Sequence, residues 1–296
     1  MSNIAMYPSS SGIVDRFTVA FTSLSITSPS GTDTLTSPGY ALPVVLDSGT
    51  TITYVPDDLA LSIYNEVGAT YYSELQEALC DCVTGTVQGT LNFGFAGANG
   101  VTIKVPISEM VSPLFRKDGT QETFTNGQPA CLFGIGPSSS LGQDAPILFG
   151  DTLLRSAYVV YDLANFRIGL AQTNFNSSSS NVVAFASLSA NIPSATTVTD
   201  ESAVTQTASK GVGVAPPDAT GGVATGAVTA AASTGLFTGN AGPGFKTAAT
   251  ATTKVAGATG TGSSKKGSAG RVEVRWGGMG LMGMLGMLVL GGAVWL

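Results

Sequence analysis

Residues 186–270 contain only two aromatic residues, Phe237 and Phe245, and few long apolar side chains. Ser, Thr, Ala and Gly dominate this stretch, so it cannot bury enough apolar surface to offset the entropy cost of ordering it. We therefore expect residues 177–276 to form a disordered, glycosylated stalk and spacer. The folded core is then confined to residues 1–176.

That half carries the two-residue periodicity of half-buried strands. Residues 16–27 predict a strand with two alternating faces. One face carries Phe17, Val19 and Phe21, and the other carries Thr18, Ala20 and Thr22. Residues 86–107 predict two strands joined by a turn at 97–100, and residues 157–171 predict two strands joined near 163–165.

One helix is predicted at residues 57–67. Asp57 and Asp58 favour its first turn, where acidic side chains meet the positive end of the helix dipole, and Gly68 ends it. The apolar stripe of this helix consists of Leu59, Ile63 and Val67. The predicted fold class is therefore all-β, mainly antiparallel, in a single domain.

Charge and composition exclude several kinds of function. Residues 1–176 hold 15 acidic and 6 basic residues, a net charge of −9, which argues against nucleic acid as a partner. The chain has no histidine, which removes Ser–His and Cys–His nucleophiles and His-ligated metals. We expect no metal and no cofactor, so any hydrolysis must depend on carboxylates.

The segment VVLDSGTTITYVP places one acid, Asp47, at the end of an apolar run. An ionised carboxylate in apolar surroundings is costly unless hydroxyls and N–H groups bind it or it shares a proton. Ser48, Thr50 and Thr51 can supply hydroxyls, and Gly49 allows a sharp turn that exposes backbone N–H groups. The alternative is an ordinary Asp–Gly turn stabilised by its own side chain.

Further along the chain comes APILFGDTLLRSAYVVYDLANFRIGLA. In this order the two segments resemble the C-terminal lobe of the pepsin-like aspartic proteases. In that lobe, a hydrophobic-hydrophobic-Gly segment crosses behind an Asp-Ser/Thr-Gly-Ser/Thr loop. Here the crossing segment is residues 148–150, Asp151 opens a short helical turn, and residues 157–171 match the closing hairpin. The resemblance covers about residues 10–176 and is nearest to the fungal yapsin type, in which CLFGI and a Ser/Thr stalk with a GPI tail also recur.

The resemblance implies one lobe of a bilobal fold and a role for each residue of the motif. Asp47 is then one of two carboxylates that share a proton and activate a water to hydrolyse a peptide bond. The residues implied to line the cleft and bind the substrate backbone are Gly49, Thr50 and Thr51. The residues implied to support the site are Ser48, Leu148, Phe149 and Gly150. Phe149 replaces the usual aliphatic residue, which we interpret as a tolerated packing change.

The resemblance also implies a disulfide in which Cys131 is one partner. Cys82 is the predicted second partner and Cys80 the alternative, because these two lie only two residues apart. Closing a loop of ~50 residues stabilises a fold by about 4 kcal/mol in the chain-entropy model. The third thiol stays free or pairs with another chain.

The chain contains one Asp-Ser/Thr-Gly-Ser/Thr motif and no second. Its N-terminus also lacks the pattern of a signal peptide. We therefore expect the C-terminal half of an aspartic endopeptidase that cleaves proteins or peptides, without the N-terminal lobe that carries the other Asp. Two alternatives stay open: a non-catalytic cell-surface or cell-wall module, and a symmetric homodimer in which each copy gives one Asp47.

Residues 277–296 contain no charge and are about long enough to span a bilayer as a helix. With the small residues and polar spacer upstream, they have the layout of a GPI-attachment signal; a retained transmembrane tail is the alternative. The candidate attachment residues are Gly262 and Ser263, followed by Ser264, and Gly267 and Ser268, followed by Ala269. Asn176 begins an N-glycosylation sequon. These features predict a location at the outer face of the plasma membrane or in the cell wall.

Overall fold

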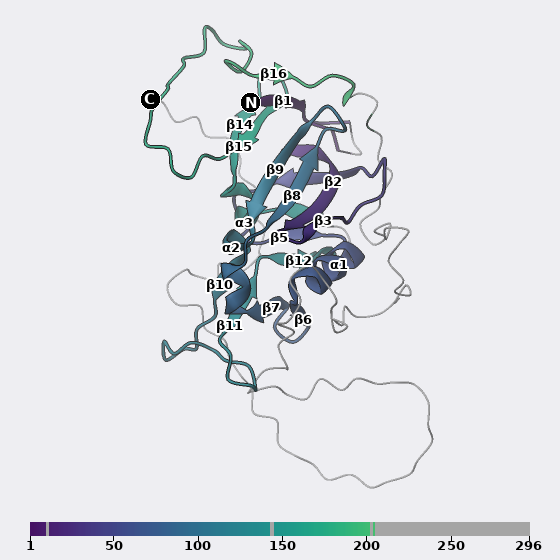
Figure 1. Ribbon diagram of the computed structural model, residues 1–296. Coiled ribbons are helices and arrows are strands. Elements are labelled where there is room, and N and C mark those ends of the chain that lie inside the picture. Colours follow the sequence, from purple (N-terminus) through teal and green to yellow (C-terminus); the bar gives the residue numbers. More distant parts are fainter. Residues whose placement is uncertain (10–11, 143–144, 202–203, 205–296) are drawn as a thin grey trace, which may run out of the picture.

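The computed structural model describes residues 1–9, 12–142, 145–201 and 204. Three sheets, which we call A, B and C, follow one another along the molecule, with sheet A at one end, sheet B in the middle and sheet C at the other end (Figure 1). Most strand pairs are antiparallel, as predicted; the parallel pairs are β12 with β5, β13 with β4 and β1 with β16. The all-β class predicted from the sequence is confirmed.

Sheet B forms the body of the molecule and carries the Asp47 motif. Its strands, in spatial order, are β12 (Ile135–Pro137), β5 (Thr53–Val55), β13 (Leu148–Phe149), β4 (Leu42–Leu46), β2 (Thr18–Ser28), β8 (Thr90–Phe95) and β9 (Val101–Pro106), with β3 (Gly31–Thr34) paired to β2. The predicted pair of strands in residues 86–107 is confirmed as β8 and β9. Asp47 follows directly from β4, so the sheet fixes where its side chain begins.

The strand predicted at residues 16–27 is present as β2, but its two faces are not continuous. The pairing of β2 with β8 shifts register between Phe21 and Ser23. Val19 and Phe21 are buried before the shift, and Leu24 and Ile26 are buried after it. Ala20 is also buried, which corrects the predicted assignment of that residue to the outward face.

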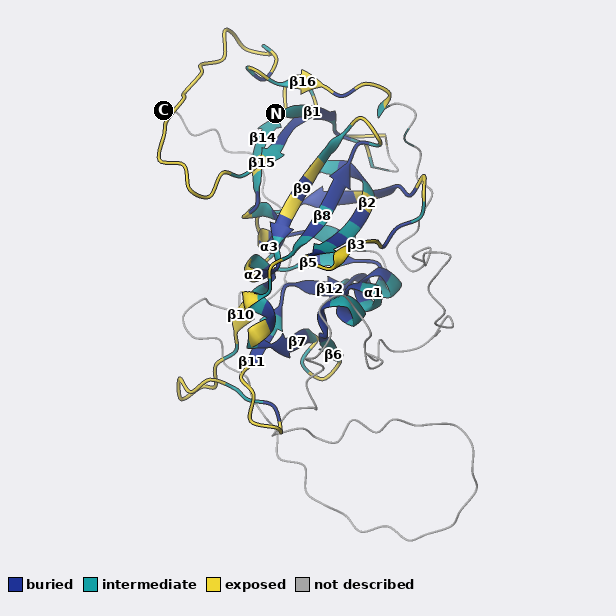
Figure 2. Ribbon diagram, in the orientation of Figure 1, coloured by how far each residue is buried: buried dark blue, intermediate teal, exposed yellow. Residues whose placement is uncertain are grey.

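Sheets A and C close the two ends. Sheet A consists of β14 (Ala157–Asp162), β15 (Arg167–Gln172), β1 (Ser2–Ala5) and β16 (Thr196–Thr197); sheet C consists of β10 (Val111–Pro113), β11 (Ala130–Phe133), β7 (Glu77–Asp81) and β6 (Thr70–Tyr72). The hairpin predicted within residues 157–171 is therefore confirmed as β14 and β15. Figure 2 shows buried residues running through all three sheets, with exposed residues in the connecting loops.

Helices are few and short. They are α1 (Asp57–Val67), η1 (Cys82–Thr86), α2 (Ile107–Met110), η2 (Ser138–Leu141) and α3 (Asp151–Leu154). Helix α1 has the predicted bounds: its Leu59, Ile63 and Val67 are buried, and Gly68 ends it in the left-handed conformation with φ 72°. In the part of the chain that the structure describes, no helix is both long and apolar enough to cross a bilayer.

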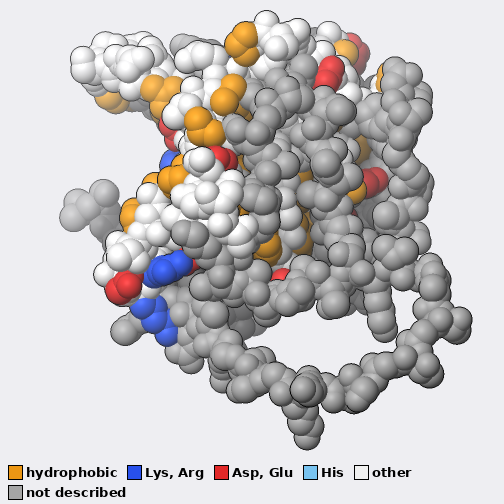
Figure 3. All heavy atoms as spheres, turned by 60° about the horizontal axis from the view of Figure 1, so that its bottom comes forward, with side chains coloured by type: hydrophobic (Ala, Val, Ile, Leu, Met, Phe, Trp, Pro, Cys, Tyr) orange, Lys and Arg blue, Asp and Glu red, His pale blue; other side chains and the backbone are white. Residues whose placement is uncertain are grey.

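The loop between β10 and β11 protrudes beyond sheet C. Arg116 and Lys117 expose positive charge there, and Arg116 forms an ion pair of 2.6 Å with Glu122. On the face shown in Figure 3, most of the visible Lys and Arg surface lies together beside an acidic side chain, whereas hydrophobic side chains are scattered. A surface ion pair of this kind contributes little to stability.

The structure differs from the predicted stalk at the end nearest to the lobe. Residues 174–189 are exposed, but Ile192 and Val198 are buried and β16 pairs with β1. The ordered chain therefore continues past residue 176, to at least Glu201. The rest of the predicted stalk, the attachment candidates Gly262, Ser263, Gly267 and Ser268, and the apolar tail at 277–296 lie outside the described residues.

Candidate active site

The carboxylate of Asp47 is held by groups from its own loop. The Gly49 N–H donates to Asp47 Oδ1 at 3.0 Å, and the Thr50 hydroxyl donates to Asp47 Oδ2 at 2.6 Å. Both carboxylate oxygens therefore have a donor, and the residue itself is half-buried. An acid at the end of a buried strand is stable under these conditions because donors replace part of its hydration.

The structure narrows the predicted set of hydroxyl donors. Ser48 and Thr51 are exposed, and within the described residues neither of their hydroxyls bonds to Asp47. Gly49 is also exposed; it does not have a positive φ, but a Cβ there would lie 3.2 Å from Asp47 Oδ1, a tight contact. These three residues present polar groups at the surface around Asp47, where another molecule can reach them.

The predicted crossing segment lies directly behind this loop. The Asp47 N–H donates to the Phe149 carbonyl at 3.0 Å, and the Asp151 N–H donates to the Thr50 carbonyl at 2.8 Å. The Thr152 N–H adds a third bond, to the Thr51 carbonyl at 3.1 Å. Three main-chain bonds therefore fix the backbone that carries the carboxylate.

Gly150 makes that close crossing possible. A Cβ atom at this position would clash with the carbonyl oxygens of both Thr50 and Ile52, which are backbone atoms and cannot rotate away. The requirement is for space and not for an unusual φ, since Gly150 has φ −95°. Any side chain here would push the Asp47 loop out of place.

Phe149 anchors the crossing segment in the core. Its ring is fully buried and lies 5.0 Å from that of Phe21, 5.6 Å from Phe93 and 6.1 Å from Phe95, all at steep angles. Edge-to-face arrangements of this kind add to the stabilisation from burial. The aromatic residue is thus accommodated by three other phenylalanines, which explains how it can stand where we expected an aliphatic one.

A buried hydroxyl pair supports the start of β5. The Thr152 hydroxyl donates to the Gly134 carbonyl at 2.8 Å, so in the 3.0 Å contact between the two hydroxyls Thr53 is the donor. The Thr53 N–H also donates to the Gly134 carbonyl, at 3.0 Å. The sequence reasoning missed this network, and its only signal was the polar Thr53 in an otherwise apolar strand.

Tyr161 is a second residue that the sequence did not indicate. It lies on β14, packs its ring 4.3 Å from that of Phe17, and is half-buried. Burial, and to a smaller extent the negative charge of Asp47, raises the pKa of its phenol above the usual value of 10.0. Tyr161 therefore stays neutral in any medium in which a carboxylate protease works.

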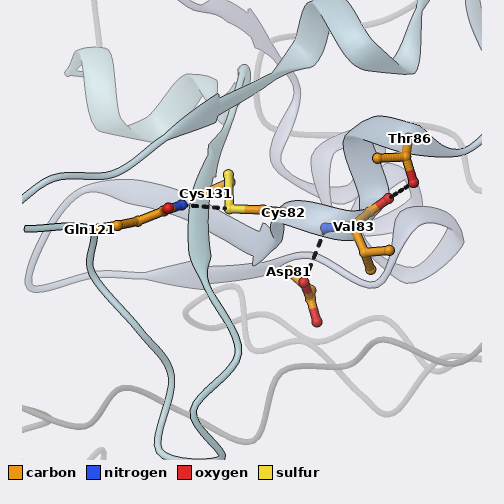
Figure 4. Close-up of a disulfide and its surroundings, with 6 residues drawn as sticks. All are labelled: Asp81, Cys82, Val83, Thr86, Gln121 and Cys131. Atoms are coloured by element: carbon orange, nitrogen blue, oxygen red, sulfur yellow. Dashed lines mark hydrogen bonds between the residues drawn. A yellow bond between two sulfur atoms is a disulfide. The ribbon is translucent and has the colours of Figure 1, made fainter.

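The predicted disulfide is present at the other end of the lobe. Cys82 and Cys131 are bonded, with their Cα atoms 5.0 Å apart, and the Gln121 amide donates to Cys82 Sγ at 3.2 Å (Figure 4). The alternative partner, Cys80, is a buried free thiol. Burial raises the pKa of this thiol to about 12, so it remains protonated and unreactive.

Glu77, on β7, is a half-buried acid that the sequence did not indicate. Burial raises the pKa of this carboxyl to about 7. Its charge is felt by Tyr54 on β5, by Tyr64 on α1 and by Tyr71 on β6, and it contributes to raising the pKa of each. One acidic side chain of sheet C therefore affects tyrosines on three different elements.

The described residues contain one suitable acid at this site and no metal centre. No group of three or more Cys, Asp or Glu side chains in the described ranges could hold a metal ion. A carboxylate with two donors can act as a general base on water, but peptide hydrolysis by carboxylates needs a second, protonated acid beside it. The described part of the chain thus offers one carboxylate, Asp47, at this site.

Comparison with known proteins identifies the family of this lobe. The model of the family "Eukaryotic aspartyl protease" matches residues 8–173. The chain is 36% identical over 234 residues to "Probable aspartic-type endopeptidase opsB" of Aspergillus oryzae, which covers 78% of this chain and 45% of the relative. It is 34% identical over 168 residues to "Aspartic proteinase 3" of Saccharomyces cerevisiae, covering 56% of this chain and 26% of the relative. It is 43% identical over 141 residues to "Candidapepsin-1" of Candida albicans, covering 46% of this chain and 31% of the relative. The chain thus spans less than half the length of each of these relatives.

Proposed function

We propose that this chain, which belongs to the eukaryotic aspartyl protease family, forms the C-terminal lobe of an aspartic endopeptidase and supplies Asp47 to the catalytic pair. The observation that carries the proposal is the set of bonds around Asp47: two donors on its carboxylate and three main-chain bonds between its loop and residues 149–152. An Asp–Gly turn stabilised by its own side chain would need the first set but not the second.

In this proposal, Asp47 shares one proton with a carboxyl group from a second lobe. Two acids so close cannot both ionise cheaply, so one stays protonated. The ionised member takes a proton from a bound water, which attacks the peptide carbonyl, while the protonated member polarises the carbonyl oxygen. The two acids titrate as a pair and not as separate residues.

The residues beside Asp47 are suited to hold an extended peptide. Gly49 and Thr51 are exposed and Thr50 is half-buried next to the carboxylate. Their peptide groups and hydroxyls offer donors and acceptors that pair with a substrate backbone of any sequence. We therefore propose proteins and peptides as substrates, with these three residues as backbone contacts and Ser48 as support on the exposed side of the loop.

The open edge of sheet A favours a partner that brings the second acid. Strand β14 is paired on one side only, with β15, among the strands that the structure describes. Its Tyr158 is 59% exposed and lies in a segment of mainly apolar residues. An apolar edge strand of this kind favours pairing with a further strand, and we propose that an N-terminal lobe provides it. A second copy of this chain, bringing its own Asp47, remains an outcome of the test below.

A non-catalytic surface module is the second candidate. It is favoured by one observation: the 296 residues contain a single Asp-Ser/Thr-Gly-Ser/Thr motif. In that case Asp47 would keep its structural bonds but would not take part in hydrolysis.

We propose a location outside the cell, at the cell surface. One relative is named "Secreted aspartic protease 1", and the disulfide suits an oxidising compartment. Asn176 is exposed, as a glycosylation acceptor must be. The GPI signal at residues 262–296, or a retained apolar tail, would hold the protein at the membrane.

The experiment compares two proteins: the 296-residue chain alone, and the same chain extended by whatever the gene encodes in frame before Met1. Cleavage of a denatured protein is measured at acidic pH for each, with Asp47→Asn and Asp33→Asn variants. Asp33 is the matched control, because it is an exposed Asp followed by Thr but lies on β3.

We expect the extended protein to cleave, Asp47→Asn to lower the rate at least ~10³-fold, and Asp33→Asn to leave it unchanged. We expect the chain alone to be inactive. Activity of the chain alone that depends on Asp47 and on dimerisation would replace the second lobe by a second copy. If neither protein cleaves, or if Asp47→Asn remains active, the protease proposal is wrong.

A further inference from the structure

Residues 192–201, which we call the C-terminal strap, lie along the edge of sheet A opposite β14. Strand β16 runs parallel to β1, with Ser2 opposite Thr196 and Asn3 opposite Thr197. The Thr196 N–H donates to the Met1 carbonyl at 3.0 Å. The strap therefore covers main-chain groups of β1 that would otherwise form an open edge.

Two buried side chains and one shielded acid hold the strap, and the Asn99 amide adds two exposed hydrogen bonds, to Thr199 at 3.3 Å and to Asp200 at 3.1 Å. Ile192 and Val198 are 4% and 7% exposed. Glu201 accepts a hydrogen bond from the Ala5 N–H at 2.7 Å and forms an ion pair of 2.6 Å with Arg167. This ion pair is shielded, because the side chains of Arg167 and Glu201 are only 20% and 13% exposed. A single acidic side chain thus joins the strap to two strands, β1 and β15.

The position of Glu201 in the chain determines the order in which the contacts of the strap break. The strap is parallel to β1, so its C-terminal end lies near the C-terminal end of that strand, where the Tyr7 hydroxyl donates to the Glu201 carbonyl at 3.1 Å. Any pull from the chain downstream of residue 204 reaches Glu201 before it reaches Val198 or Ile192. Beyond Val204, whose side chain lies beside Gly97, Glu201 is thus the first polar contact with the lobe that must break if the strap is to peel away.

The segment that connects the strap to the lobe makes no comparable contacts. Residues 174–189 are all exposed, with Val182 at 91% and Leu188 at 93%. Proteases cut exposed segments of this kind most readily. Such a cut would divide the chain between the lobe and everything that follows it.

We infer that the C-terminal strap holds the downstream chain on the lobe by non-covalent contacts after the exposed segment 174–189 has been cut. Glu201 keeps the strap bound, through its contacts with Arg167 and the Ala5 N–H. Release of the lobe from its downstream chain then needs two events, a cut in this segment and opening of the strap. Whether the lobe is catalytic does not enter this inference.

The test uses the full chain, kept soluble in a non-ionic detergent, with residues 177–183 replaced by a seven-residue site for a sequence-specific protease. Hydrogen exchange is measured at Thr196 and Val198 before and after cleavage. We expect cleavage to change their exchange less than about threefold, because the strap stays bound. Glu201→Ala should accelerate exchange in the cut chain at least about tenfold, whereas Asp200→Ala, which removes only an exposed 3.1 Å hydrogen bond from the Asn99 amide, should accelerate it less than about threefold.

The inference is overturned if cleavage alone makes the strap exchange as fast as residues 184–189. It is also overturned if the Glu201 and Asp200 variants behave alike. Exchange in β7 and β11, at the far end of the lobe, reports whether a variant has unfolded the whole domain. If Glu201→Ala unfolds the whole domain, Glu201→Gln is used instead, because it keeps the shape of the side chain and removes its charge. The inference is overturned if Glu201→Gln does not accelerate exchange at Thr196 in the cut chain.

Discussion

The Asp47 loop and the C-terminal strap are both short segments at the border of a sheet, but they are held in different ways. The loop is bonded through its main chain to a buried crossing segment, whose Phe149 lies in the centre of the core. The strap is bonded to an edge strand, and one side chain, Glu201, makes its strongest polar contacts. The loop should therefore move only when the lobe unfolds, whereas the strap can open by itself.

Replacing Gly150 should have the largest effect, because it removes the space that joins the loop to the core. We expect Gly150→Ala to lower the free energy of unfolding by about 3 kcal/mol or more, since the new Cβ meets two backbone carbonyls. Urea denaturation followed by circular dichroism measures this. Gly85→Ala is the control: its Cβ would lie 3.1 Å from the Val111 side chain, which can shift, so we expect a cost of about 1 kcal/mol or less. Equal costs for both variants would mean that the crossing is not tight.

The difference between loop and strap also explains what the sequence could predict. The loop requires particular residues at fixed spacing, Asp47, Gly49 and Gly150, and such requirements leave a readable pattern. Strand β9 and helix α1 were predictable because each buries one face of a regular element, and β8, β14 and β15 because turn residues mark where the two hairpins reverse. The crossing of residues 148–150 behind the loop came from the family resemblance and not from periodicity.

The strap left no such pattern. It buries two apolar side chains within a stretch rich in Ser, Thr and Ala, and its strand has only two residues. Its fastening depends on Arg167 and Glu201, which are 34 positions apart in the sequence, and no local rule pairs them. For the same reason, the Thr53–Thr152 contact and the burial of Glu77 became visible only when distant strands were placed side by side.

Glu77 should make the stability of the lobe depend on pH. Its folded-state pKa of about 7 lies above the usual glutamate pKa of 4.5, so the folded state binds this proton more tightly than the unfolded state. Stability from this group is complete below about pH 4.5 and is lost as the pH rises through about 7. The loss is about 1–3 kcal/mol, reduced because part of the group is exposed.

Glu77→Gln should remove this loss, so the variant should be more stable than the parent at pH 8 and similar at pH 4. Urea midpoints at both pH values measure the difference. The control is Glu74→Gln, which alters an exposed acid in the turn between β6 and β7. An unchanged pH dependence in Glu77→Gln would show that the carboxyl is well hydrated in solution.

The smallest expected effect separates local opening from global unfolding. Val198 and Val19 are both buried valines, one on the strap and one on β2. Val19→Ala should lower the free energy of global unfolding by about 2 kcal/mol, because it leaves a cavity in the core. Val198→Ala should lower the free energy of the main urea transition by less than about 0.5 kcal/mol and instead accelerate exchange at Thr196 several-fold, because the strap has already opened before that transition begins. If both substitutions lower the global value equally, the strap unfolds together with the lobe. It would then be as firmly built into the fold as the Asp47 loop, and a cut in residues 174–189 would not be enough to prepare the lobe for release.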